Sequence, residues 1–479
     1  MIPINFSLLN EDEMRQIDDQ ARMILEKTGV RVLHEESLRL LESFGCAIDN
    51  TGKIAHIPGQ LVQDALDATP SEFSLYGIDT SFKIDLGGDN VHFGPGGFAI
   101  FAEDLNGTRH VATREDLLNT LRLSDELDTV TFNHVNVNAS DLPKSVSDLY
   151  VWADSFTYQS KPIMNENFSW RSVLALLDMG EVIRGSKEAF LEKPCACLDV
   201  CVVSPLTHNE RQVDLLHFAA EYGLPVSINS GPIGGASSPI TLAAIATQAN
   251  VELLSAIVIC YCKKPGAKVL YGSWGRHLDM RTTLVTMGGP EYAMLKTTTA
   301  QMGRYYGVPT RGGGALSDSL VPDAQAGYEK MLTTLIPALS RVNYISGMGL
   351  NETENCFSPA QLIIDDEVVA MVQRVLRGIE TDVKDMGVDA IMDVGPGGEF
   401  LSHQHTLDNF KDAVLYPKIS NRGTYVDWEK RGGKGLGDRA MDIAREMLAK
   451  PVRPVIEQKK ADELVQIAEA VRGELERME

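Results

Sequence analysis

The first 90 residues carry apolar side chains at the spacing of amphipathic helices. Between Glu11 and Lys27 the apolar positions recur every three or four residues, and residues 35–44 repeat this pattern. A polar turn signal at residues 49–53 and a third short helical segment around residues 59–67 follow. The pattern therefore predicts a mostly helical N-terminal extension over residues 1–90.

From about residue 91 the pattern changes to short apolar runs that alternate with amphipathic segments. The candidate strands are residues 98–104, 130–137, 162–165, 196–202, 225–228, 269–271, 308–310 and 343–346. The candidate helices are residues 114–125, 145–158, 170–184, 209–222, 240–262, 290–306, 324–339 and 359–378. Repeated strand–helix units give parallel strands with right-handed crossovers, and eight such units close a barrel. We therefore expect an α/β fold, a (β/α)₈ TIM barrel, over residues 91–380.

The last part of the chain, residues 381–479, is more polar and helical. It has glycine-rich loops at residues 395–398 and 432–435, and its final helix is expected over residues 459–479. We expect this C-terminal helical region to pack on the barrel. The pattern leaves open whether it caps the mouth of the barrel or only extends its packing.

Composition narrows the range of functions. The chain has 479 residues, of which 44% are hydrophobic, so a large core is possible. A net charge of −22 argues against nucleic acid as a partner, because phosphate binding needs a basic surface. An odd number of cysteines (seven), a start without an apolar signal-peptide core, and no stretch of about 18 apolar residues favour a reducing cytoplasm without a membrane span. Large barrels often self-associate, so we expect a homo-oligomer.

Candidate chemistry in such a barrel lies where the strands end at their C-terminal side. The residues expected there are mostly neutral and polar or aromatic, and they include Phe98, Glu166, Asn229, Tyr271, Trp274, Arg311 and Phe357. There is no G-x-S-x-G motif for a serine nucleophile. His403 and His405 lie outside the barrel and lack a third ligand, so we expect no metal bound by the chain. The glycines at 231–235 and 312–314 fit either a phosphate site or tight turns equally well.

Several ordered motifs resemble those of the trimethylamine methyltransferase family. They are Gly94-Pro-Gly-Gly97, Asn229-Ser-Gly-Pro-Ile-Gly-Gly235, the segment from Asp318 to Gly327, and Gly395-Pro-Gly-Gly-Glu-Phe-Leu401 followed by His405-Thr406. The resemblance covers residues 10–450. It implies a (β/α)₈ barrel whose mouth receives the cobalamin of a separate small corrinoid-binding protein, with no cofactor bound by the chain itself.

One departure from the family changes the expected substrate. The resemblance places the pyrrolysine of the founding enzyme in the loop near Leu320, but this sequence contains only standard amino acids. Members without pyrrolysine resemble enzymes that demethylate glycine betaine, proline betaine or carnitine. The resemblance therefore implies transfer of a methyl group from a quaternary amine to the Co(I) of the corrinoid protein.

A quaternary nitrogen leaves as a neutral amine, so the reaction needs positioning and no general acid. Aromatic faces bind such cations, which makes Phe98, Tyr271, Trp274 and Phe357 candidates for a cage. Arg311 is a candidate partner for a substrate carboxylate. Two alternatives stay open: another TIM-barrel enzyme that acts on a phosphorylated small molecule, and a non-catalytic barrel that recruits the corrinoid protein.

Overall fold

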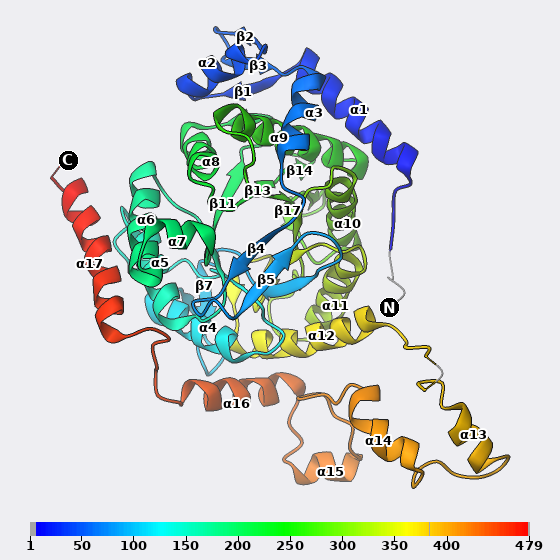
Figure 1. Ribbon diagram of the computed structural model, residues 1–479. Helices are drawn as coiled ribbons and strands as arrows, with labels where there is room; N and C mark the ends of the chain where they lie inside the picture. Colours follow the sequence, from blue (N-terminus) through cyan, green and yellow to red (C-terminus); the bar gives the residue numbers. More distant parts are fainter. Residues whose placement is uncertain (1–5, 383, 478–479) are drawn as a thin grey trace.

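The computed structural model describes residues 6–382 and 384–477, and eight parallel strands in these residues form its central barrel (Figure 1). The order around the sheet is β6 (His92–Pro95), β19 (Tyr344–Met348), β18 (Thr310–Gly313), β15 (Val269–Ser273), β13 (Val226–Ser230), β11 (Ala196–Val202), β10 (Ile163–Asn165) and β9 (Asn133–His134). The two end strands meet where the Thr131 N–H donates to the Phe93 carbonyl oxygen at 2.9 Å. The predicted (β/α)₈ barrel is confirmed.

Helices follow the strands and cover the outside of the barrel. They are α4 (Arg114–Glu126), α5 (Ser147–Tyr158), α6 (Trp170–Arg184), the short α7 (Lys187–Glu192), α8 (Glu210–Tyr222), α9 (Leu242–Lys263), α10 (Pro290–Tyr305), α11 (Ala324–Leu339) and α12 (Pro359–Arg377). Side chains cap several of them at the residue before the first turn. Ser169 accepts a hydrogen bond from the Ser172 N–H at the start of α6, and Asp323 does the same for Ala326 at the start of α11.

The first barrel strand differs from the prediction. The predicted strand 98–104 contains β7 (Phe101–Glu103), which pairs with β8 (Arg109–Val111) and β21 (Cys356–Phe357) in a separate sheet above the barrel. The barrel strand is β6, which overlaps the start of the glycine-rich motif that precedes Phe98. A side chain on Gly94 would place its Cβ 2.5 Å from the ring of Phe132, so close packing across the barrel requires glycine in this strand.

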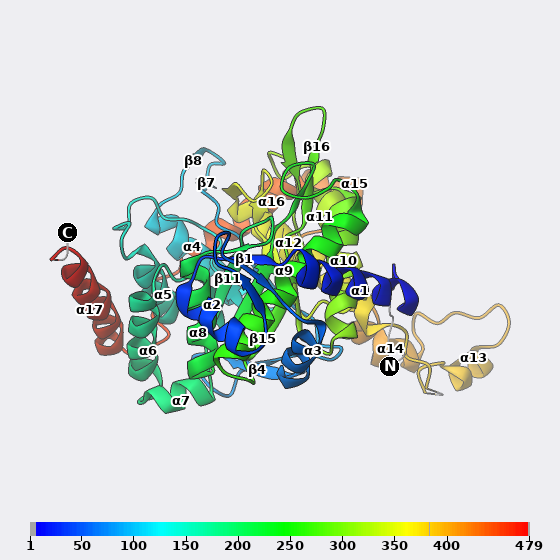
Figure 2. The same cartoon turned by 90° about the horizontal axis from the view of Figure 1, so that it is seen from above.

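A hairpin closes the N-terminal end of the barrel. Its strands, β4 (Phe73–Tyr76) and β5 (Lys83–Leu86), pair antiparallel and lie over the barrel centre in Figure 1. Their buried side chains form one cluster with inward-facing residues of the barrel: Phe73, Leu75, Ile84, Leu86, Phe132, Met164, Cys197, Leu270 and Tyr344. In the turned view of Figure 2, β4 lies at the opposite end of the molecule from β7, β8 and the hairpin that contains β16 (Arg276–Asp279).

The N-terminal segment combines helices with a small sheet. It contains α1 (Glu11–Lys27), α2 (Glu35–Ser43) and α3 (Gly59–Ala68), with β1 (Val30–Val32), β2 (Ala47–Asp49) and β3 (Ile54–His56). Strand β1 also pairs in parallel with β12 (Thr207–His208), which follows β11, so this segment is joined to the barrel.

Helix α9 is the one place where the expectation about membrane spans needs revision. Among the described residues, α9 alone is long and apolar enough to cross a membrane, although no such stretch was expected. Two thirds (67%) of its most apolar stretch of 18 residues are buried inside the protein, where α1, α3, α8 and α10 pack around it. A helix that is apolar on all sides is typical of a protein core covered in this way.

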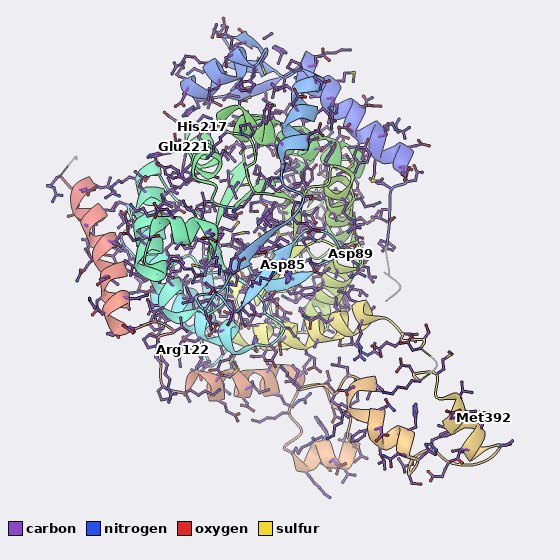
Figure 3. The ribbon with its side chains drawn as sticks, viewed as in Figure 1. Asp85, Asp89, Arg122, His217, Glu221 and Met392 are labelled. Atoms are coloured by element: carbon purple, nitrogen blue, oxygen red, sulfur yellow. The ribbon has the colours of Figure 1, made fainter. Side chains whose placement is uncertain are left out.

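The C-terminal region divides into two parts. Helices α16 (Leu436–Leu448) and α17 (Gln458–Leu475) pack on the barrel, α16 against α12 and α4, and α17 against α5 and α6. Helices α13 (Val388–Val394), α14 (Gln404–Ala413) and α15 (Tyr425–Lys430) extend away from the barrel, with Met392 at the far side (Figures 1 and 3). In the described chain, no residue of this region lines the pocket discussed below.

The hairpin β4–β5 generates a test of the fold. Leu86 is fully buried against the N-terminal end of the barrel, so Leu86→Ala should lower the free energy of unfolding by about 2–5 kcal/mol. The same change at Leu401, which is 83% exposed, should alter it by less than about 0.5 kcal/mol. Urea denaturation followed by circular dichroism measures both values. Equal values for the two variants would show that the hairpin does not support the barrel.

Candidate functional site

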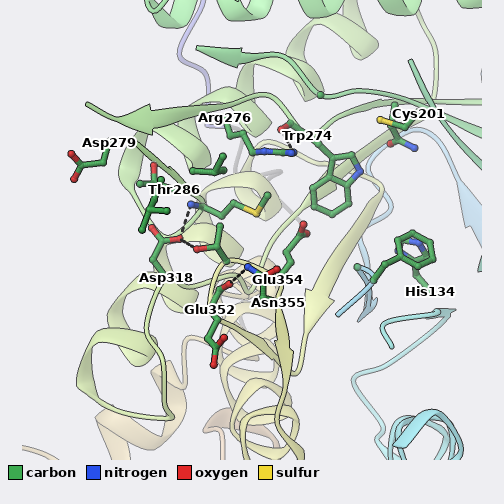
Figure 4. Close-up of a pocket in the computed structure, with 18 of the residues that line it drawn as sticks. His134, Cys201, Trp274, Arg276, Asp279, Thr286, Asp318, Glu352, Glu354 and Asn355 are labelled. Atoms are coloured by element: carbon green, nitrogen blue, oxygen red, sulfur yellow. Dashed lines mark hydrogen bonds between the residues drawn. The ribbon is translucent and has the colours of Figure 1, made fainter. Parts of the chain in front are cut away.

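A cavity of about 1000 Å³ opens at the C-terminal end of the barrel (Figure 4). Its floor consists of residues on the strands, among them His134, Asp199 and Asn229. Its walls come from the loop after β6, the hairpin β16–β17 (Leu284–Thr286), the loop after β18, and the turn between β20 (Leu350–Asn351) and β21. This is the end of the barrel at which TIM-barrel enzymes hold their substrates.

A buried ion pair lies at the floor of this cavity. The guanidinium of Arg311, whose side chain is fully buried, donates to Asp199 Oδ1 at 3.1 Å and to Asn229 Oδ1 at 2.6 Å. Its second terminal nitrogen lies 3.0 Å from His134 Nδ1, and His134 Nε2 lies 3.3 Å from Asp199 Oδ2. Burial alone would raise the pKa of Asp199, but the charge of Arg311 and the contact with His134 hold it at about 2. Burial and the nearby Arg311 lower the pKa of His134, so the neutral ring accepts at Nδ1.

Two aromatic side chains form part of the wall. Trp274 follows β15, and its backbone N–H donates to the Ser230 carbonyl oxygen at 2.8 Å. The guanidinium carbon of Arg311 lies 4.8 Å from the centre of its ring. Phe98, 37% exposed, stands edge-on to His134 with ring centres 5.5 Å apart. Both aromatic residues line the cavity, so their ring surfaces are available to a bound cation.

Two carboxyl groups of the wall have raised pKa values. Burial raises the pKa of Glu166 to about 7, with a further contribution from the charge of Asp199. Burial also raises the pKa of Glu354 to about 7, although Arg276, Arg311 and Lys296 act in the opposite direction. Both groups are therefore close to half-ionised at neutral pH, and a cation beside either of them would favour its charged form.

A second guanidinium reaches the cavity from the hairpin β16–β17. Arg276 donates from Nη1 to the Trp274 carbonyl oxygen at 3.2 Å. Its buried Nε has no hydrogen-bond partner within the described part of the chain. Because Arg276 lines the cavity, its guanidinium can form a bidentate pair with an anionic group of a ligand.

Comparison with known proteins identifies the family. The sequence pattern described as trimethylamine methyltransferase (MTTB) matches residues 2–472. The chain belongs to this family. It is 31% identical to a glycine betaine methyltransferase of Desulfitobacterium hafniense (strain Y51), over 89% of each chain. It is 29% identical to the trimethylamine methyltransferase MttB of Methanosarcina thermophila, over 94% of this chain and 95% of the relative.

A solved structure shares the barrel fold. The crystal structure of the Methanosarcina barkeri monomethylamine methyltransferase (MtmB) superposes with a TM-score of 0.54 at 11% identity, over 94% of this chain and 89% of that one. At this identity the likeness supports the barrel fold alone. The family membership supports methyl transfer as the class of reaction that the site carries out.

The structure brings four of the seven predicted site residues of this methyltransferase to the cavity, namely Phe98, Glu166, Asn229 and Trp274. The prediction is wrong for Tyr271 and Phe357 as cage residues. Tyr271 points out of the barrel, where its hydroxyl donates to Asn250 on α9. Phe357 is buried in the core between the outer sheet and α12.

Arg311 lies below the cavity and not in its wall. Its charge is matched by Asp199, so the reason for predicting a free partner for a substrate carboxylate no longer applies. The sequence analysis missed Arg276, which lies beyond the expected strand end on a hairpin that carries no apolar alternation of its own. It also missed Asp199, although a lone carboxylate inside the apolar run of β11 was a signal that could have found it.

Other predicted features have structural explanations. Gly312 and Gly313 lie inside β18, and a Cβ on Gly313 would come within 2.0 Å of the Tyr292 hydroxyl, so packing accounts for glycine there. His403 accepts from the His405 N–H at the start of α14, outside the barrel.

One group of three potential metal ligands occurs among the described residues: His34, Glu36 and His217. It lies between α2 and α8, on the outside of the barrel. Two of its members already have partners, because His34 Nδ1 accepts from the Ser37 N–H and Glu36 pairs with Lys263 at 3.0 Å. These contacts give the group a structural explanation that needs no ion.

The ion pair at the floor generates a stability test. Arg311→Ala leaves Asp199 as a buried charge without its partner, so we expect the free energy of unfolding to fall by about 3–5 kcal/mol. Arg276→Ala removes a side chain of the same type from the cavity wall and should change the free energy of unfolding by less than about 1 kcal/mol. Urea denaturation of the two variants tests this. A larger loss for Arg276→Ala would assign the structural role to the other guanidinium.

Proposed function

We propose that this methyltransferase moves a methyl group from a quaternary amine of the glycine betaine type, such as glycine betaine, proline betaine or carnitine, to the Co(I) of a separate corrinoid protein. The observation that carries the proposal is the pairing of opposite groups in one cavity. The Trp274 ring and the carboxyl groups of Glu166 and Glu354 suit a quaternary ammonium, and Arg276 suits the carboxylate of the same molecule. The similarity to a glycine betaine methyltransferase supports this substrate class.

The proposed methyl transfer needs no acid–base catalysis by the protein. The corrinoid supplies a Co(I) nucleophile that accepts the methyl group. When the C–N bond breaks, its electron pair stays on nitrogen and the amine leaves neutral, so the site needs no proton donor for this step. The residues of the cavity therefore act by holding the cation in one orientation and by excluding water.

The rim of the cavity fits the approach of a partner protein. Leu284 and Leu320 are each 68% exposed at the rim, and Leu320 lies in the loop in which the resemblance places pyrrolysine. Exposed apolar side chains around an opening are typical of a protein-binding surface. We propose that the corrinoid protein binds here and supplies the cobalamin, so the chain holds no cofactor or metal of its own.

The remaining proposals concern the setting of the enzyme. All seven cysteines are free, which suits a reducing cytoplasm. The net charge of −22 suits a cationic substrate and opposes binding of nucleic acid. Many apolar side chains on α13 to α15 are exposed, including Ile391, Met392 and Leu407, which suits burial in a homo-oligomer.

A methyl-transfer assay tests the proposed function. The protein is incubated with a Co(I) corrinoid protein and a panel of methylated amines, and the loss of Co(I) absorbance is followed. We expect turnover of glycine betaine or a related quaternary amine and none of trimethylamine. Arg276→Ala should slow the use of glycine betaine far more than the use of tetramethylammonium, which lacks a carboxylate. Turnover of trimethylamine alone would contradict the proposal.

A second test addresses the aromatic wall. Trp274→Leu keeps apolar character but removes the ring face that attracts a cation, so methyl transfer should fall about tenfold. The melting temperature should change little, because Trp274 is only partly buried. A variant that loses activity only in proportion to lost folded protein would show that Trp274 serves packing alone.

A further inference from the structure

The turn that carries Glu354 has an unusual backbone. Three consecutive residues, Glu352, Thr353 and Glu354, have positive φ angles of 52°, 55° and 69°. None of them is glycine, and the left-handed region costs about 1–2 kcal/mol for such residues. A turn of this kind persists only where surrounding contacts stabilise it.

Contacts from two loops and from the outer sheet hold the turn. The Glu352 N–H donates to the Ser319 carbonyl oxygen at 2.9 Å, and the Thr353 N–H donates to that of Ser317 at 3.0 Å. The Thr353 hydroxyl donates to Asp318 at 2.9 Å, and Asp318 also accepts the Met287 N–H at 2.8 Å. The Glu352 carboxylate pairs with Arg109 of β8 at 2.8 Å. The loops after β17 and β18 and the outer sheet therefore fix the turn together.

The result of this arrangement is the position of the Glu354 carboxyl group. It points into the cavity, toward the Trp274 ring, as Figure 4 shows. Its Oε1 is buried and has no hydrogen-bond partner within residues 6–382 and 384–477. A buried carboxylate oxygen without a partner is costly, so its presence points to a ligand that supplies one.

The other carboxylates of the cavity already have partners. Asp199 pairs with Arg311, Asp279 with Arg281, and Glu352 with Arg109. Asp318 accepts the two hydrogen bonds described above, and Glu166 lies 3.8 Å from Arg211. Within the described chain, Glu354 alone among these six makes neither an ion pair nor a side-chain hydrogen bond.

We infer that Glu354 is the residue that selects a positively charged nitrogen over a neutral one, by binding the substrate's ammonium between its carboxylate and the Trp274 ring. This inference rests on the proposed function and deepens it, since it names one group as the determinant of the preference for a charged substrate. The strained turn then has a purpose, because a relaxed turn would let the carboxylate rotate toward solvent or toward Arg276.

A dependence on pH follows from the surroundings of this carboxyl group. The ionisable groups that face it are Arg276 from β16, Arg311 from β18, Lys296 and Tyr292 from α10, Asp318 from the β18–α11 loop, and Glu352 from its own turn. Burial outweighs the cations among them and raises the pKa of Glu354 to about 7. Below this pH the group is neutral and must lose its proton before it can pair with the ammonium. Affinity for a quaternary amine should therefore rise between pH 6 and pH 8, and binding should release protons.

Calorimetry with glycine betaine and its neutral carbon analogue, 3,3-dimethylbutanoate, tests the inference. For Glu354→Gln, which keeps the shape but not the charge, we expect glycine betaine to bind about 30-fold more weakly. The neutral analogue should change by less than about threefold, because it has no charge to lose. Glu429→Gln, the same change on the exposed surface of α15, should leave both affinities unaltered.

Two further measurements use wild-type protein and so do not depend on whether a variant folds. Wild-type protein at pH 6.5, titrated in buffers of different ionisation enthalpy, should release roughly 0.8 proton per glycine betaine bound, given the pKa of about 7. The affinity of the same protein should increase from pH 6 to pH 8. A binding reaction without proton release and without this increase overturns the role of Glu354.

The outcomes also separate this inference from the proposed function. If Glu354→Gln, with an unchanged melting temperature, binds glycine betaine as tightly as wild type, the inference fails and methyl transfer from quaternary amines can still hold. If wild-type protein transfers no methyl group from any quaternary amine to the corrinoid protein, the proposed function fails.

Discussion

The buried ion pair between Arg311 and Asp199 is the constraint on which the site depends. A guanidinium without solvent contact is tolerated only when its charge is matched and most of its donors are used. Here Asp199 of β11, Asn229 of β13 and His134 of β9 all contact it from their own strands. The pair makes the floor of the cavity close to neutral. The wall groups Glu166, Glu354 and Arg276 are left outside this ion pair and line the cavity, where a ligand can contact them.

Much of the barrel could be predicted from the sequence, and the reasons are local. Helices α6 and α11 begin and end where the pattern placed them, because Ser169 and Asp323 cap their first turns and the apolar period of each is unbroken. Strand β11 is an uninterrupted apolar run with one carboxylate, and its bounds were also predicted. Strand β6 was missed because Gly94 lies within it and Gly96 and Gly97 follow it, and the close packing of Gly94 against Phe132 is not visible in a linear pattern.

The site was less predictable than the fold. Strand ends could be located, which is why Phe98, Glu166, Asn229 and Trp274 were found. The direction of a side chain at a strand end changes with every residue, so Tyr271 was assigned to the wrong face. Glu354 depends on three left-handed residues in a row, and nothing in the letters Glu-Thr-Glu indicates that conformation.

The hairpin β4–β5 determines from which side reactants can reach the cavity. Because its apolar side chains fill the lower end of the barrel, the cavity has its entrance at the upper rim. A partner protein that binds on this rim covers the same entrance through which small molecules pass. If the corrinoid protein binds at this rim as proposed, the amine enters before the partner binds, and the demethylated product leaves after the partner has dissociated. Under the proposed function, a barrel closed at one end would thus impose an order on the exchange of reactants, with one binding event of the partner for each methyl group moved.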